Sequence, residues 1–368
     1  MPDDFIPAHG GQLRELAAKF GIPAASLIDF SASINPLPPS DALVDALCNQ
    51  IKARTVLTTY PDTNYTALKH AIAEYAQVVP STIAISNGVM PLLDAAVRAL
   101  DFRKCLVQVP SFTEYRRVLH ACGAECCILT SNPEEGFAIK ADKSISELKA
   151  VNPQAVLLAN PQSPSGRLVS RRELLQLYEA AFALGVTTMV DEAFIDYAPD
   201  ESLSQVATQL PGLVVLRSLT KFFSIPGLRV AYAVAHPDVR AAMELRIPTW
   251  PVSSIAAEGA RLALEDSASI AAARDINERE RNWLADALES LGLKVFPSKA
   301  NFLLVIIAEA REGNELWRRL IVEHRVVIRS CANFEGMDER YFRIGVRTNP
   351  ENQILVRALA EELHSKPH

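Results

Sequence analysis

The sequence has few glycines, no internal repeat, no low-complexity tract and no apolar run long enough to cross a membrane. Only 15 of its 368 residues are glycine, while 49% are hydrophobic and 22% are charged, which is typical of a globular protein with a large core. A membrane-spanning helix needs about 18 or more consecutive apolar residues, and no stretch of that length occurs. Disordered, fibrous and membrane-spanning classes are therefore excluded.

Positive charge is also scarce. The chain carries 37 Lys and Arg residues against 43 Asp and Glu residues, a formal net charge of −6 at pH 7. Binding to nucleic acid relies on a surface rich in cations that neutralise phosphates, so we expect no nucleic-acid partner. Two acidic residues lie within residues 1–10, where a secretory signal begins with basic ones. We expect a cytoplasmic protein that acts on a small molecule, without contact to a membrane.

The six cysteines follow no regular spacing, and a chain of this size does not need disulfides to fold. We therefore expect reduced thiols. The one group that resembles a metal site comprises His120, Cys122, Cys126 and Cys127. We interpret residues 126–129 instead as part of a strand in which cysteine acts as a small hydrophobic side chain, and we expect no bound metal.

The order of the predicted elements indicates an α/β fold. A chain of 368 residues exceeds what one compact core usually supports. Its middle alternates β-branched apolar runs with amphipathic runs, which is typical of a largely parallel sheet covered by helices on both faces. We predict seven strands, at residues 83–86, 105–109, 125–130, 155–159, 187–190, 214–218 and 229–235.

Beyond about residue 253 the pattern changes to a smaller α+β arrangement. Its predicted helices and short strands lie at residues 256–264 and 270–291, and at 302–306, 326–329 and 341–346. We therefore divide the chain into an N-terminal arm that closes over the substrate (1–40), a large domain (41–254) and a small C-terminal domain (255–368).

Polar residues follow three of the predicted strands directly. Ligands bind at the carboxyl ends of the strands in open α/β sheets, so residues 160–166, Asp191 and Lys221 are expected to face one pocket. Lys221 precedes two phenylalanines, and Arg229 follows nearby. Such a semi-apolar, cationic setting lowers the pKa of a lysine toward that of a useful nucleophile. A lysine beside aromatic residues is by itself more often a solvated side chain. The order of the surrounding motifs therefore decides whether Lys221 is a solvated or a nucleophilic lysine.

These motifs resemble those of fold-type I pyridoxal-phosphate (PLP) enzymes in the class II aminotransferase family. The resemblance covers almost the whole chain and rests on the order Asp191-Glu192-Ala193-Phe194, Ser218-Leu219-Thr220-Lys221 and Gly227-Leu228-Arg229. Two groups in the family are similar: threonine-phosphate decarboxylases of cobalamin synthesis and, next, histidinol-phosphate aminotransferases. The first are favoured by Phe194, where aminotransferases commonly carry tyrosine, and by segments 8–11, 29–36, 60–62 and 328–334. The resemblance implies the PLP-dependent transferase fold, PLP as cofactor and a homodimer.

The resemblance also implies the roles of the cofactor-binding residues. Lys221 would bond to the aldehyde carbon of PLP and later move protons at the substrate. Asp191 would keep the pyridine nitrogen protonated, and Phe112 would stack on the ring. The phosphate would lie before an apolar helical run, where free N–H groups hold an anion. Its implied ligands are Asn87, Gly88, Val89, Ser218, Arg229 and, from the partner subunit, Tyr60.

The contact to the ring oxygen of PLP departs from the family pattern. Ser163 stands where the family commonly has an asparagine that donates to the phenolate oxygen of PLP. A serine hydroxyl can donate as well, and the neighbouring Asn160 is the alternative donor. We expect this change to alter the tuning of the cofactor more than its binding.

The implied substrate contacts come from both ends of the chain. Arg343 matches the arginine that grips the substrate carboxylate, with Arg347 on the same predicted strand as the alternative. Arg329 matches the position that contacts a substrate phosphate, and His9 and Asn35 would close over that phosphate.

The leading hypothesis is PLP-dependent decarboxylation of L-threonine O-3-phosphate to (R)-1-aminopropan-2-ol O-2-phosphate for cobalamin biosynthesis. The alternative is a histidinol-phosphate aminotransferase that uses 2-oxoglutarate, because the two groups share almost every implied cofactor residue. Which bond breaks depends on how the substrate is held against the cofactor ring, and the sequence does not reveal that orientation. A regulator or inactive scaffold with the same fold is disfavoured because the lysine is present.

Overall fold

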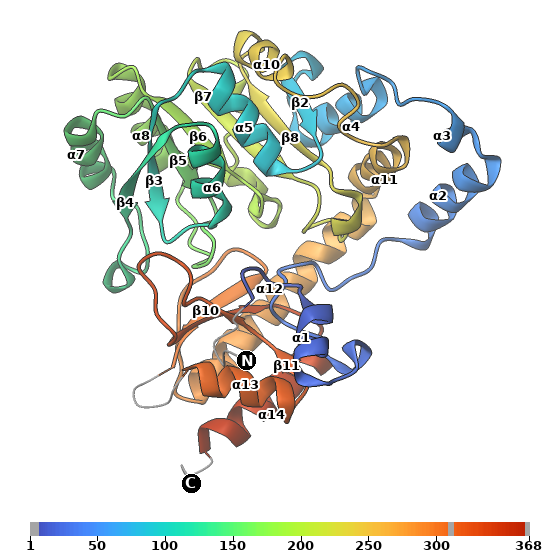
Figure 1. Cartoon of the computed structure of the whole chain (residues 1–368), viewed down its shortest axis with the longest axis vertical. Coiled ribbons are helices and arrows are strands. Elements are labelled where there is room, and N and C mark those ends of the chain that lie inside the picture. Colours follow the sequence, from blue (N-terminus) through green and yellow to red (C-terminus); the bar gives the residue numbers. More distant parts are fainter. Residues whose placement is uncertain (1–6, 308–312, 365–368) are drawn as a thin grey trace.

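A seven-stranded sheet forms the centre of the larger part of the molecule (Figure 1). The computed structural model describes residues 7–307 and 313–364. In spatial order the strands are β2 (Ile83–Ser86), β8 (Ala231–Ala235), β7 (Leu213–Ser218), β6 (Thr187–Asp191), β5 (Ala155–Ala159), β3 (Lys104–Val109) and β4 (Glu125–Thr130). Only β8 runs antiparallel to its neighbours β2 and β7. All seven predicted strands are confirmed, and each boundary lies within two residues of its prediction.

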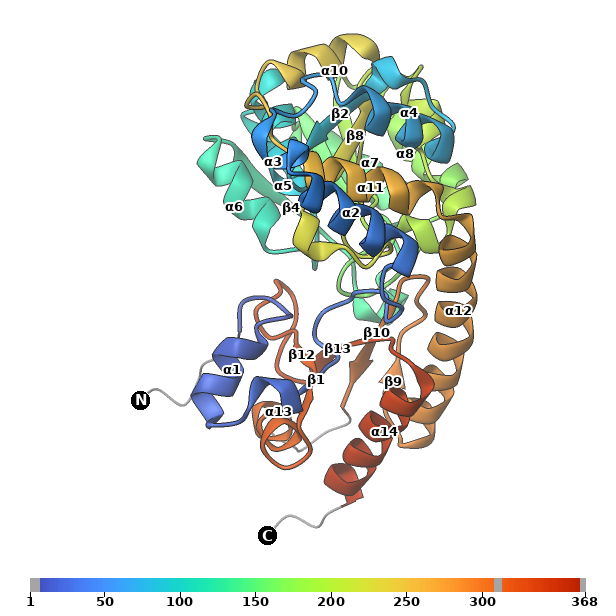
Figure 2. The same cartoon turned by 90° about the vertical axis from the view of Figure 1, so that its right-hand side faces the viewer.

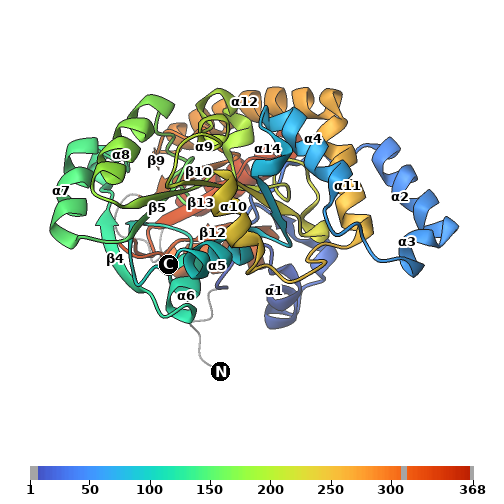
Figure 3. The same ribbon diagram turned by 90° about the horizontal axis from the view of Figure 1, so that it is seen from above.

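Successive side chains of each strand point to opposite faces of this sheet, so each face has a separate hydrophobic core. Leu157 and Met189 pack in one core, while their neighbours Val156 and Val190 pack in the other. The first face is covered by α5 (Val89–Ala99), α6 (Glu114–Ala121) and α10 (Pro237–Glu244). The second face is covered by α4 (Thr66–Ala76), α7 (Ala141–Val151), α8 (Arg171–Ala183), α9 (Ser204–Ala207) and α11 (Ser254–Glu265) (Figure 3). This layering is the predicted α/β fold.

The C-terminal part forms a smaller α+β unit around a four-stranded sheet. Its strand order is β12 (Arg329–Ser330), β13 (Tyr341–Gly345), β10 (Phe302–Ile306) and β9 (Lys294–Val295). The helices are α12 (Ser267–Ser290), α13 (Gly313–Val322) and α14 (Asn349–His364). The strand predicted at 326–329 is split, because β11 (Val326–Val327) pairs with β1 (Ile28–Asp29) while β12 pairs with β13.

Helix α12 connects the two parts along one side of the molecule (Figure 2). It is amphipathic: Leu284 and Leu288 are buried, and charged residues cover much of the remaining surface. Within residues 7–307 and 313–364, no helix combines the length and apolar character that a membrane crossing requires.

The N-terminal segment packs against the C-terminal unit. Helix α1 (Leu13–Phe20) contributes Leu16 to the apolar cluster that also contains Phe30, Trp317 and Leu320. The turn before α1 needs a glycine, because a Cβ on Gly10 would lie 2.1 Å from the carbonyl oxygen of Ser31. The chain then crosses to the large sheet and enters α2 (Asp41–Ala53) and α3 (Thr55–Thr58).

The predicted division into an arm, a large domain and a small domain stays a prediction. Three stretches of these predicted units, residues 1–6, 308–312 and 365–368, lie outside the described residues.

Candidate active site

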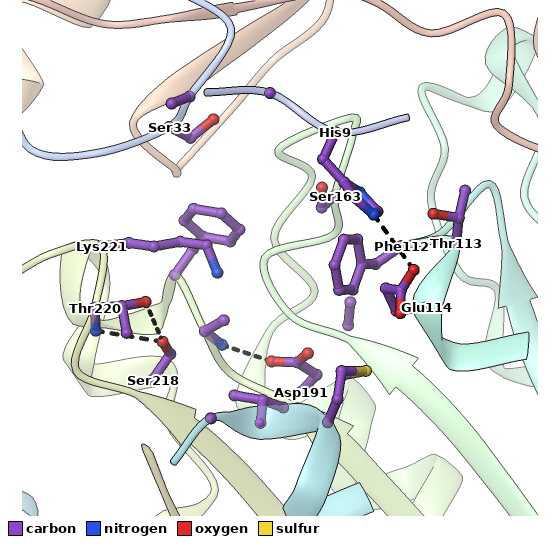
Figure 4. Close-up of a pocket in the computed structure, with 18 of the residues that line it drawn as sticks. His9, Ser33, Phe112, Thr113, Glu114, Ser163, Asp191, Ser218, Thr220 and Lys221 are labelled. Carbon is purple, nitrogen blue, oxygen red and sulfur yellow. Dashed lines mark hydrogen bonds and ion pairs between the residues drawn. The ribbon is translucent and has the colours of Figure 1, made fainter. Parts of the chain in front are cut away.

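A cavity of about 550 Å³ lies between the carboxyl ends of the large sheet's strands and the C-terminal unit (Figure 4). Eleven of the sequence-predicted site residues line it together: His9, Gly88, Val89, Phe112, Ser163, Asp191, Ser218, Lys221, Arg229, Arg329 and Arg343. Three others do not line it: Asn35, Asn87 and Tyr60.

Asp191 ends β6 and is 6% exposed. One carboxylate oxygen accepts a hydrogen bond from the hydroxyl of Tyr115 at 2.6 Å, and the other accepts from the backbone N–H of Ala193 at 2.9 Å. Burial raises the pKa of Asp191, although these two hydrogen bonds and the nearby Lys221 lower it. Among the described residues no cation forms an ion pair with this carboxylate. It is therefore suited to a ligand that brings a cationic N–H group.

Lys221 lies in the loop after β7. Its amine is 4.7 Å from the ring centroid of Phe194, and no described side chain forms an ion pair with it. The low-polarity surroundings lower the pKa of Lys221, and Arg343 and Arg229 lower it further, while Asp191 acts in the opposite direction. A larger fraction of the amine is therefore neutral and able to attack a carbonyl carbon.

The start of α5 forms an anion cradle. Gly88 is its N-cap residue at φ 138° and ψ 167°, a backbone conformation that is essentially restricted to glycine. A Cβ at this position would lie 3.2 Å from Nη2 of Arg229. The first N–H groups of a helix lack partners within the helix and point at an anion on its axis. Ser218 ends β7, and its hydroxyl lies 2.7 Å from that of Thr220.

Ser163 lines the cavity together with Pro161 of the same turn. Its hydroxyl accepts a hydrogen bond from Nη1 of Arg343 at 3.0 Å, which leaves its own proton available for a ligand. The side chain of Asn160 is fully buried, donates to the carbonyl of Val169 at 3.0 Å and accepts from its N–H at 2.8 Å. Asn160 is thus occupied by backbone groups, and Ser163 is the candidate for a ring-oxygen contact.

Arg343, rather than Arg347, faces the cavity. Besides Ser163, its guanidinium donates to the carbonyl of Ser31 at 3.2 Å, and its Nε has no partner among the described residues. Arg347 instead donates to Glu351 and to the backbone carbonyl of Asp29 at 3.0 Å. Glu351 therefore compensates the charge of Arg347 within the chain, whereas no carboxylate of the described residues forms an ion pair with Arg343.

Arg329 is 4% exposed and lies beside the N-terminal segment. It donates to the carbonyls of Pro7 at 3.1 Å and Ala8 at 2.7 Å, and to the side-chain oxygen of Asn333 at 2.7 Å. Burial lowers the pKa of Arg329 to about 10, and the charge of Arg343 acts in the same direction. No carboxylate in the described part of the chain forms an ion pair with it. The guanidinium of Arg329 is buried and that of Arg343 is partly buried, and neither forms an ion pair with a carboxylate of the described residues. Together they make this end of the cavity a second anion site.

His9 holds the N-terminal segment over the cavity. Its Nε2 is 3.3 Å from the carboxylate of Glu114 in the first turn of α6, and its ring centroid is 5.8 Å from that of Phe112. Figure 4 shows His9 and Phe112 on the same side of the cavity. The imidazole, the aromatic ring and the carboxylate thus form one wall of the cavity.

The three predicted site residues that do not line the cavity are Asn35, Asn87 and Tyr60. Asn35 fixes its segment to the lysine loop, because its amide donates to the carbonyl of Phe222 at 2.9 Å and its backbone N–H donates to that of Lys221 at 3.0 Å. Asn87 is exposed. Tyr60 is 78% exposed and stacks on Trp250 at 4.3 Å. Their implied roles stay predictions.

The cavity side chains that sequence reasoning missed include Tyr115, Thr220 and Glu114. Tyr115 and Glu114 belong to an amphipathic helix in which no local signal separates a site residue from a core or surface residue. Thr220 had a usable signal, since it lies between two residues already assigned to the cavity.

Residues 25–359 match the family model described as aminotransferase class I and II. The chain belongs to the class I and II aminotransferase family. Threonine-phosphate decarboxylase of Salmonella typhimurium is 35% identical over 98% of this chain and 97% of its own. Histidinol-phosphate aminotransferase of Methanosarcina mazei is 29% identical over 97% of this chain and 93% of its own. A solved decarboxylase structure from Sulfurospirillum multivorans superimposes with a TM-score of 0.87 at 25% sequence identity. The superposition covers 98% of this chain and 95% of that one.

Enzymes of the class I and II aminotransferase family depend on PLP, and the cavity fits this cofactor. The carboxylate of Asp191 is buried and forms no ion pair with a cation of the described residues. It can therefore accept a hydrogen bond from a protonated pyridine nitrogen. The cradle at Gly88, which a Cβ would fill, and the guanidinium of Arg229 suit a phosphate dianion. Lys221 lines the same cavity as these two features. The donors and acceptors present therefore match the charges of PLP at both ends.

Proposed function

We propose that this chain is a PLP-dependent carboxy-lyase that converts L-threonine O-3-phosphate into (R)-1-aminopropan-2-ol O-2-phosphate for cobalamin biosynthesis. The observation that carries the proposal is the second anion site formed by Arg329 and Arg343, apart from the cradle at α5. The cavity is lined by five Lys and Arg residues but by only two acidic ones. This excess of positive charge suits a phosphorylated cofactor together with a phosphorylated amino acid. Similarity to the Salmonella decarboxylase over nearly the full length supports the same reading.

The residues of the first anion site would hold the cofactor. Gly88, Val89 and Ser218 would hold its phosphate with Arg229, and Asp191 would keep its ring nitrogen protonated. When bound, PLP accepts the electron pair that is released when a bond at the substrate α-carbon breaks. Phe112 would cover the ring and exclude water.

The residues of the second site would hold the substrate. Arg329 would bind the substrate phosphate and Arg343 the carboxylate, with His9 closing the cavity above them. A bond at the α-carbon breaks most easily when it is held perpendicular to the cofactor ring, so the positions of the two arginines select the reaction. Lys221 would then deliver a proton to the α-carbon after CO2 has left, because the lowered pKa of Lys221 makes its ammonium group a stronger acid.

A comparison of products tests this function. We expect the holoenzyme to release CO2 from L-threonine O-3-phosphate at the same rate with and without 2-oxoglutarate. Histidinol phosphate with 2-oxoglutarate should give no glutamate above background. Formation of glutamate without CO2 release would overturn the proposal in favour of transamination, the reaction of the Methanosarcina relative.

We further propose that the enzyme acts as a homodimer in which Tyr60 reaches the cofactor phosphate of the partner subunit. Leu57, Tyr60 and Trp250 are 61%, 78% and 41% exposed, and α2, α3 and α11 lie on the face that Figure 2 presents. Exposed apolar side chains that gather on one face mark interaction surfaces. Sedimentation equilibrium should give the mass of two chains. Tyr60→Phe should weaken PLP binding several-fold without dissociating the dimer, whereas a monomer with wild-type PLP affinity would contradict the assignment.

A further inference from the structure

A buried ion-pair cluster lies directly behind the residues that face the cavity. Successive side chains of a strand point to opposite sides of the sheet. Asp191 and Ser218, on neighbouring strands, line the cavity, while the adjacent Glu192 and Arg217 do not. Both of these side chains are almost completely buried, with exposures of 0% and 5%.

Arg217 connects the strand ends that carry the proposed cofactor ligands. Its Nη1 lies 3.5 Å from the carboxylate of Glu192, and its Nη2 donates to the carboxylate of Asp196. Nη1 also donates to the hydroxyls of Ser202 at 3.1 Å and Ser204 at 3.2 Å. One guanidinium on β7 therefore holds the whole turn that follows β6.

The carboxylates of the cluster are fixed from other directions too. Glu192 accepts from the hydroxyl of Ser202 at 2.6 Å and from the N–H of Leu203 at 2.7 Å. Asp196 accepts from the hydroxyl of Tyr75 at 2.8 Å. Arg274 of α12 donates to the backbone carbonyl of Asp196 at 2.9 Å. The cluster thus joins β6, β7, α4 and the helix that leads to the C-terminal unit.

Charge balance makes this connection stiff. Two buried carboxylates share the single buried guanidinium of Arg217, so its loss leaves both without their main cation. A buried charge deprived of its partner is strongly unfavourable, and the turn would move to solvate Glu192 and Asp196. Because Glu192 directly follows Asp191, the same movement would displace the carboxylate that faces the cavity.

We propose that the buried cluster of Arg217, Glu192 and Asp196 is a positioning element that fixes the cavity-facing Asp191 relative to Ser218 and so sets the affinity for PLP. The inference rests on the proposed cofactor role of the cavity. None of the three side chains touches the cavity, so they act through the two neighbouring residues. A role confined to stability would lower the melting temperature but leave the affinity of the folded protein for PLP unchanged.

The test compares the apoproteins of the wild type, Arg217→Gln, the double variant Arg217→Gln/Glu192→Gln, and Leu284→Ala. PLP is titrated into each, and the dissociation constant, the absorbance maximum of the complex and the apoprotein melting temperature are recorded. Leu284 is fully buried in the C-terminal cluster, so Leu284→Ala is the control for lost stability alone.

We expect Arg217→Gln to raise the PLP dissociation constant about tenfold, within the range for residues coupled in one ion-pair network. The double variant should recover part of this loss, because it also removes the uncompensated charge of Glu192. Leu284→Ala should lower the melting temperature but keep the wild-type dissociation constant. An unchanged dissociation constant in Arg217→Gln, or an equal rise in Leu284→Ala, would overturn the positioning role.

Glu192→Gln serves if Arg217→Gln does not fold, because the amide keeps the shape of the side chain and an acceptor for Leu203. It should raise the dissociation constant at least about threefold, and no rise would again overturn the inference. A wild-type chain that binds no PLP would contradict the proposed cofactor site itself, whereas the outcomes named for the variants contradict only the positioning role.

Discussion

Replacing Gly88 by alanine should damage both folding and cofactor binding, for two reasons that can be measured separately. At φ 138° and ψ 167°, a residue with a Cβ carries about 1–3 kcal/mol of backbone strain. The new methyl group would also lie 3.2 Å from Nη2 of Arg229, so the guanidinium has to move away from the cradle. We therefore expect the free energy of unfolding of the apoprotein to fall by about 1–3 kcal/mol.

The cofactor affinity should fall as well. Because the guanidinium of Arg229 is displaced from the cradle, we expect a PLP dissociation constant that is about 5- to 150-fold higher, which corresponds to about 1–3 kcal/mol. Urea unfolding of the apoprotein and PLP titration measure the two effects. Gly185→Ala is the matched control, because Gly185 has φ 73° and no atom lies within 4 Å of the position that its Cβ would take. That variant should lose stability but keep its PLP affinity. Wild-type affinity in Gly88→Ala would refute the cradle.

The same cavity supports three further predictions. Lys221→Ala should remove the visible absorbance of bound PLP, and a variant that is still yellow after dialysis would contradict the covalent attachment. Asp191→Asn should weaken PLP binding at least about tenfold yet stabilise the apoprotein at pH 8. The raised pKa of Asp191 means that its stabilising contribution is lost as pH rises through that pKa, so urea unfolding should show the gain shrinking on acidification. Arg329→Gln should raise KM for phosphorylated substrates at least about tenfold while leaving PLP absorbance unchanged; equal loss of both would contradict a substrate role.

The sequence was sufficient to predict the strands of the large sheet and to assign Asp191 and Lys221 to one cavity. Its seven strands are short apolar runs bounded by polar residues, a local signal that does not depend on distant contacts. Asp191 and Lys221 could be assigned to one cavity because each follows such a strand, and parallel strands place their carboxyl ends at the same edge. The glycine before α5 likewise marked a helix start.

Tertiary structure decided between side chains that local patterns cannot separate. Arg343 and Arg347 are four residues apart, so alternation places both on the same face of an extended strand. Strand β13 ends at Gly345, however, and Arg347 pairs with Glu351 of the following helix, which leaves only Arg343 at the cavity. Ser163 and Asn160 share an irregular turn without any period, and only the hydrogen bonds to Val169, nine residues further along the chain, show that the side chain of Asn160 is occupied.

The sequence by itself determined which chemical groups the chain offers and which strand ends carry them, since both depend on neighbours along the chain. Only the folded structure decided how groups from distant segments meet: the N-terminal His9 beside Glu114, and Arg217 against two buried carboxylates. Such contacts depend on how helices and sheets pack against one another, and no local period encodes that packing.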